Sequence, residues 1–97
     1  MAEHASVIRI LRLKPASGKR DEMMSRLEQG AEGIRQQEGC FGVQVCTVRE
    51  SPDELAVISR WASQSALDAF LNNSDPQRGG INALAAGELV TEHLTPI

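Results

Sequence analysis

Arg9 is the residue whose type and position most clearly predict chemistry in this sequence. It lies within ASVIRILRL, residues 5–13, an aliphatic and β-branched stretch that is typical of a β-strand. Because side chains alternate along a strand, Arg9 shares one face with Leu11 and Leu13. A guanidinium on an apolar face either pairs with an acidic neighbour or water, or anchors an anionic or phenolate ligand. In the second role Arg9 would be catalytic, since it would stabilise a substrate carbanion or enolate.

Trp61 is the second candidate, at the end of one predicted strand and just before a predicted helix. It is the only tryptophan, and the chain has two phenylalanines and no tyrosine. Its ring either fills the core with a large apolar area or stacks on a planar ligand, and a pocket wall would combine both roles. We therefore predict Arg9 and Trp61 as the catalytic residues of a site with apolar walls.

Seven further residues are predicted to bind the substrate, because they share the inner faces of the predicted strands or the apolar stripe of a predicted helix. Ser59 has no histidine or acidic partner at a catalytic spacing, so we expect it to orient a ligand and not to act as a nucleophile. Met23 and Leu27 fit plain core packing equally well. The seven residues are Leu11, Met23, Leu27, Phe41, Val43, Ser59 and Phe70.

The sequence contains no motif for a metal or a phosphate group. His4 and His93 are the two histidines, and no third ligand follows them at a metal-binding spacing, so we place both on the surface. Cys40 and Cys46 form neither a CxxC nor a zinc pattern and are expected to be reduced packing thiols. The SGK at 17–19 lacks the upstream glycine and the following Ser or Thr of a phosphate loop. We therefore expect no cofactor and no metal.

The apolar pattern along the chain predicts six elements that would position these residues. Ser63 is suited to cap the second helix, and Gly39 is placed to end the first. In order, the elements are a strand at 5–13, a helix at 19–37, strands at 41–49 and 55–61, a helix from Ser63 and a strand at 88–94.

This order predicts one α+β domain over residues 1–97 with ferredoxin-like βαββαβ topology. A four-stranded antiparallel sheet with both helices on one face is the simplest packing. The strands are apolar on both faces, because Ile8, Ile10 and Ile58 oppose the inner set. Two helices cover only one face, so the other is expected to pack against a second copy of the chain in a homodimer, a dimeric α+β barrel.

Composition limits the partners and the location of this chain. A net charge of −3 argues against the clustered positive surface that nucleic acids and anionic membranes require. The N-terminus has no signal peptide, and no apolar run is long enough to span a membrane. Together with two cysteines that form no obvious pair, these features favour a cytoplasmic protein.

The order and spacing of four segments resemble the antibiotic biosynthesis monooxygenase domain, a dimeric α+β barrel, over nearly the whole chain. The segments are RILRLKP, SGKRDEM, QQEGCFG and RWASQSALDAF. Trp61, Ser63, Ala66 and Leu67 match the tryptophan-x-serine-x-x-alanine-leucine segment of the family.

The resemblance implies an activity and a location for the site. Oxidising members of the family act on polycyclic aromatic or quinol substrates without metal or flavin, between the sheet and the helices. Haem-degrading members use an asparagine where Arg9 stands here and a histidine where Phe70 stands, so the axial haem ligand is missing. The expected function is a cofactor-independent monooxygenase acting on a small aromatic or quinol-type molecule. The alternative is a non-catalytic dimeric module of the same fold that binds a small ligand or supports an assembly.

Overall fold

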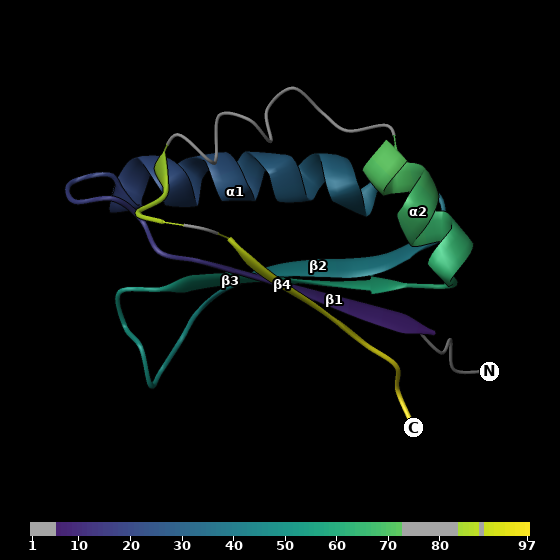
Figure 1. Ribbon diagram of the computed structural model, residues 1–97. Helices are drawn as coiled ribbons and strands as arrows, with labels where there is room; N and C mark the ends of the chain where they lie inside the picture. The colour runs from purple at the N-terminus through teal and green to yellow at the C-terminus, as the bar shows by residue number, and fades with distance from the viewer. Residues whose placement is uncertain (1–5, 73–83, 88) are drawn as a thin grey trace.

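The computed structural model describes residues 6–72, 84–87 and 89–97, and it contains one four-stranded antiparallel sheet with two helices on one face (Figure 1). The elements follow the predicted order: β1 (Val7–Leu13), α1 (Arg20–Arg35), β2 (Cys40–Thr47), β3 (Leu55–Trp61), α2 (Gln64–Asn72) and β4 (Val90–Leu94). The strand order in the sheet is β2-β3-β1-β4. The ferredoxin-like α+β prediction is confirmed, since α1 carries the chain from β1 to β2 and leaves the place between them for β3.

The ends of the two helices differ in how well the sequence predicted them. Ser63 caps α2, because its hydroxyl oxygen accepts a hydrogen bond from the backbone N–H of Ala66 at 3.1 Å. By contrast, α1 ends at Arg35 with Gln36 as its C-cap, so the prediction that Gly39 ends this helix is wrong. Gly39 instead turns the chain into β2 with a φ of 84°, in the left-handed region.

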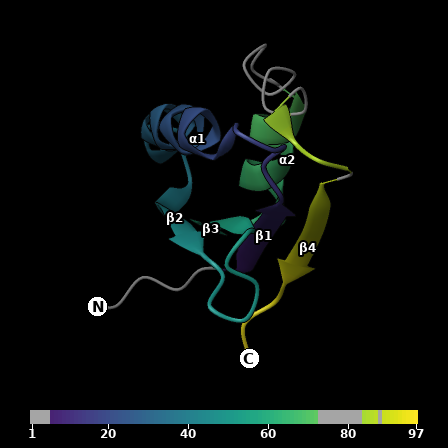
Figure 2. The same cartoon turned by 90° about the vertical axis from the view of Figure 1, so that its left-hand side faces the viewer.

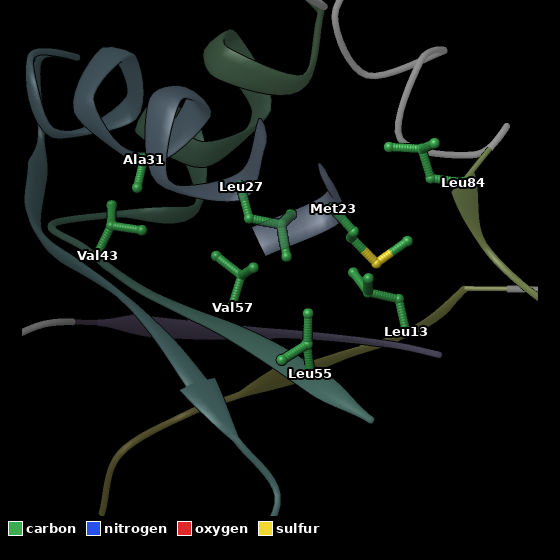
Figure 3. Close-up of a cluster of buried hydrophobic side chains, with 8 residues drawn as sticks. All are labelled: Leu13, Met23, Leu27, Ala31, Val43, Leu55, Val57 and Leu84. Atoms are coloured by element: carbon green, nitrogen blue, oxygen red, sulfur yellow. The ribbon is translucent and has the colours of Figure 1, made fainter. Parts of the chain in front are cut away.

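The core lies between the helices and the sheet in two clusters. The smaller cluster joins Val7, Trp61 and Leu67 beneath α2. Each fully buried aliphatic side chain contributes about 1.5–3 kcal/mol, so the larger cluster is what holds α1 on the sheet. Figure 3 shows its members: Leu13, Met23, Leu27, Ala31, Val43, Leu55, Val57 and Leu84.

The reverse face of the sheet carries no helix among the described residues (Figure 1), and its apolar side chains lie beside the charged residues Arg12, Arg60 and Glu92. Ile8, Ile10 and Ile58 are half-buried on this face. Val90 and Leu94 of β4 are 53% and 42% exposed, which is high for side chains of this type. The single chain therefore leaves open the second apolar face that the strand pattern predicts. In the described part of the chain, no helix is long and apolar enough to cross a membrane.

Candidate functional site

A row of side chains crosses the helix-facing side of the sheet and brings three polar residues together. Arg9 on β1 is the register partner of Ser59 on β3 and of His93 on β4. Val43 on β2 continues the row beyond Ser59. Directly opposed residues of antiparallel strands point to the same face, with Cβ atoms about 4.5–5.5 Å apart. Ser59, Arg9 and His93 therefore stand side by side, in that order.

Arg9 is the charged centre of this row, and it is mostly buried. Only 9% of its surface is exposed, and its Nε atom is inaccessible to solvent. Val7 and Leu13, which share its face of β1, are core residues, so Arg9 faces inward, a facing that the strand alternation alone left open. A guanidinium keeps its positive charge. In this low-dielectric position that charge acts more strongly on a ligand anion than it would at the surface.

Trp61 lies on β3 two residues beyond Ser59, opposite Val7 on β1, and it is a core residue in this structure. It is fully buried, and its indole Nε1–H donates a hydrogen bond to the Ser59 hydroxyl oxygen at 2.9 Å. Its ring stacks on Phe70 of α2, with centroids 5.3 Å apart and planes inclined by 25°. Because Phe70 is only partly buried, it presents the aromatic surface that remains accessible. Ser59 keeps its own O–H as a donor.

Four predicted substrate-binding residues lie at different depths. Met23, Leu27 and Val43 belong to the core cluster beneath α1, with Val43 near Ala31 and Met23 near Leu13 (Figure 3). Leu11 is half-buried on β1, two residues from Arg9 on the same face. Of these four, Val43 stands in the row itself as the register partner of Ser59, and Leu11 is one cross-strand position away. A contact of any of the four with substrate stays a prediction.

Phe41, the remaining predicted residue, lies at a β-bulge that the sequence pattern did not reveal. The bulge falls between Cys40 and Gly42, and it places Cys40 opposite Trp61. Phe41 is 39% exposed, whereas Cys40 packs against both core clusters. Burial raises the pKa of the Cys40 thiol, which makes it a poor nucleophile and fits the predicted packing role.

His93 is the residue of this site that sequence reasoning missed. We placed it on the surface, and it is exposed, yet it stands on the helix-facing side of β4 opposite Arg9. The alternation in ELVTEHL indicates only that His93 and Thr91 lie on the same face of the strand. The register between β1 and β4 is what places His93 opposite Arg9. His4 lies outside the described residues. Within those residues, no group of three or more His, Cys, Asp or Glu could hold a metal ion.

Within the part of the chain that the structure describes, the row is most open over β4. The first helix packs on β2 and the second on β3, as Figure 2 shows, whereas every residue of β4 is exposed. Phe70 packs against the cluster that includes Val7, and Val7 is two residues from Arg9 on the same face. A ligand that enters over β4 would therefore meet His93 first, then Arg9, with Phe70 at the side.

Comparisons with known proteins agree with this fold. The model of the antibiotic biosynthesis monooxygenase family matches residues 6–79. Rv0793 from Mycobacterium tuberculosis superposes with a TM-score of 0.82 at 23% identity, covering 94% of each chain. A conserved protein from Methanosarcina mazei Go1 gives a TM-score of 0.81 at 20% identity, covering 94% of this chain and 93% of that one.

A further solved structure, named an antibiotic biosynthesis monooxygenase, has a TM-score of 0.79 at 16% identity and covers 94% of this chain and 98% of its own. A comparison with curated proteins found no match. At these identities the solved structures show the shared fold. The family match spans most of the sequence, and the protein therefore belongs to the antibiotic biosynthesis monooxygenase family.

Proposed function

We propose that this protein is a monooxygenase that oxidises a small aromatic or quinol-type molecule without metal or flavin. Family membership supports the monooxygenase assignment. One observation supports the substrate class. The mostly buried guanidinium of Arg9 lies among apolar side chains, and the partly exposed Phe70 packs against the adjoining cluster that includes Val7. An aromatic ring with one ionisable oxygen matches both features, because the ring packs on Phe70 while the oxygen contacts Arg9.

Without a cofactor, the substrate itself must supply the electrons that reduce O2. Loss of the phenolic proton makes the ring electron-rich, and the Arg9 guanidinium stabilises the resulting anion. The anion passes one electron to O2, and the two radicals combine to form a carbon–oxygen bond. The peroxide then loses water, so that a hydroquinone and O2 give a hydroxyquinone and water. The substrate supplies all four electrons, and no external reductant is required.

Replacing Arg9 tests this proposal. We expect Arg9→Met to lower kcat/KM for quinol oxidation by about 100-fold or more, because the anion loses its cationic partner. The measurement is oxygen consumption with a panel of hydroquinones and polycyclic phenols. Arg26→Met is the matched control, since Arg26 is exposed on α1, and it should keep wild-type turnover.

Two outcomes contradict the proposal in different ways. A wild-type protein that consumes no oxygen with any member of the panel removes the oxygenase assignment. An Arg9→Met variant with full turnover leaves the assignment and removes the role of Arg9.

The alternative function is a non-catalytic module that binds a small apolar ligand or supports an assembly. Phe70 favours it, because phenylalanine on α2 offers neither a proton acceptor nor a metal ligand to the site. Trp61 is the only tryptophan, and its contact with Phe70 makes its fluorescence a reporter of ligands at this corner. A saturable fluorescence change without oxygen uptake supports the alternative.

The homodimer is also a proposal, and it rests on the apolar reverse face. We expect two copies to pack their sheets together there, because Ile8, Ile10, Val90 and Leu94 otherwise leave apolar surface in water. Leu94→Asp should convert the dimer to a monomer in sedimentation velocity. Since Leu94 is already 42% exposed in the single chain, this change should not unfold the monomer. Ser25→Asp on the exposed side of α1 is the control, and a monomeric wild-type protein would refute the proposal.

A further inference from the structure

The strand register places a proton acceptor beside the buried cation, and this pair has a specific chemical use. We propose that His93 is the general base of the site. It removes the proton from the phenolic oxygen of the substrate, and Arg9 holds that oxygen as an anion. This inference rests on the proposed oxygenase function and adds a catalytic residue to it.

The geometry comes from the pairing of β1 with β4. Arg9 and His93 are direct register partners, so their Cβ atoms lie about 4.5–5.5 Å apart and both side chains point to the helix-facing side. We infer that one substrate oxygen held by the guanidinium lies within hydrogen-bond reach of the imidazole. The neighbours of His93 along the strand, Glu92 and Leu94, point to the reverse face and do not compete for this position.

Arg9 is buried and His93 is exposed, and each exposure suits the role proposed for that residue. Arg9 is 9% exposed, which keeps the anion in a poorly solvated position where the cation stabilises it strongly. His93 is exposed, so the proton that it receives can pass on to water between turnovers. The step moves one proton from oxygen to a ring nitrogen, and no electron moves with it.

His93 is also the member of the row suited to this task. Arg9 keeps its protons and cannot act as a base at neutral pH. Ser59 is buried and accepts the indole N–H of Trp61. An imidazole, by contrast, exchanges its proton in the physiological pH range and is the side chain used most often for general base catalysis.

The test uses two substrates with the same ring skeleton. One is an unsubstituted hydroquinone, which is protonated at pH 7.5, and the other carries electron-withdrawing substituents that ionise it at that pH. We expect His93→Gln to lower kcat/KM for the protonated quinol by about 100-fold, the scale of general base catalysis. Turnover of the ionised quinol should remain close to wild type, because that substrate needs no base. Added imidazole should restore part of the lost activity.

The pH profile gives a second readout that a merely structural role would not change. The pH dependence of kcat/KM for the protonated quinol should differ between the wild type and His93→Gln, because only the wild type has a general base at this position. Arg9 is the charged group that faces His93 from β1, the strand paired with β4, and it does not titrate in this range. Glu92→Gln is the matched control on the reverse face, and it should retain the wild-type profile.

The outcomes separate this inference from the function on which it rests. Wild-type turnover that persists in His93→Gln on both quinols overturns the base and leaves the oxygenase intact. An equal loss on both quinols also overturns the base, because it points to a role in positioning or folding, which circular dichroism would check. A wild-type protein that consumes no oxygen with either quinol overturns the proposed function itself.

Discussion

Replacing Trp61 with alanine should lower the free energy of unfolding by about 4 kcal/mol, the scale for removing a fully buried tryptophan. The ring is completely buried, stacks on Phe70 and contributes to the cluster with Val7 and Leu67. A domain of this size has a total stability of about 5–15 kcal/mol, so the variant should be close to its limit. Urea denaturation followed by far-ultraviolet circular dichroism measures the change without the lost fluorophore.

Trp61→Phe is the control that separates packing from hydrogen bonding. It keeps an aromatic ring against Phe70 but removes the N–H that is bonded to Ser59. We expect a smaller loss, about 2 kcal/mol. If Trp61→Ala loses no more than about 0.5 kcal/mol, the range of ordinary surface substitutions, Trp61 is not part of a sealed core.

The second large effect concerns the glycine that joins α1 to β2. Gly39→Ala should lower the free energy of unfolding by about 3 kcal/mol, through left-handed strain and overpacking together. Gly39 has a φ of 84°, and a Cβ built there would lie 2.5 Å from the Cβ of Ala66 in the first turn of α2. Because both atoms are attached directly to backbone, relief requires α2 to move. Thermal or urea unfolding measures the loss.

Gly18 offers a matched control for this prediction. Its φ of 75° is also left-handed, but a Cβ there would meet nothing within 4 Å. Gly18→Ala should therefore lower the free energy of unfolding by about 1 kcal/mol, the cost of the left-handed backbone strain alone. The double variant Gly39→Ala with Ala66→Gly should recover the overpacking part. Equal losses at Gly18 and Gly39 would contradict the contact between Gly39 and α2.

These two predictions concern the corner that sets the position of α2 over the sheet. The carbonyl oxygen of Gly39 accepts a hydrogen bond from the backbone N–H of Ala62 at 2.7 Å, directly after Trp61. The same corner carries Phe70, the accessible ring of the candidate site. A variant that moves α2 should therefore change ligand affinity as well as stability.

The sequence by itself determined the order of the elements, because that order depends on local patterns. The alternation in residues 5–13 identified β1 and placed Arg9 on one face with Leu11 and Leu13, whereas the burial of Arg9 in the structure shows that this face is the inward one. Ser63 marked the start of α2 through its side-chain cap. Apolar residues on both faces of the strands predicted a second apolar surface, and the structure has one. Each of these signals spans a few neighbouring residues.

Only the tertiary structure decided which of these residues meet. His93 and Arg9 are far apart in the sequence, and their pairing depends on the register of β4, which no local pattern encodes. The bulge at Cys40 and Gly42 put Cys40 opposite Trp61, since one extra residue changes the alternation. Gly39 looked like a helix cap, and its contact with Ala66 is a long-range one. Strand register and helix docking are cooperative properties of the whole sheet, and for that reason the candidate site emerged only from the fold.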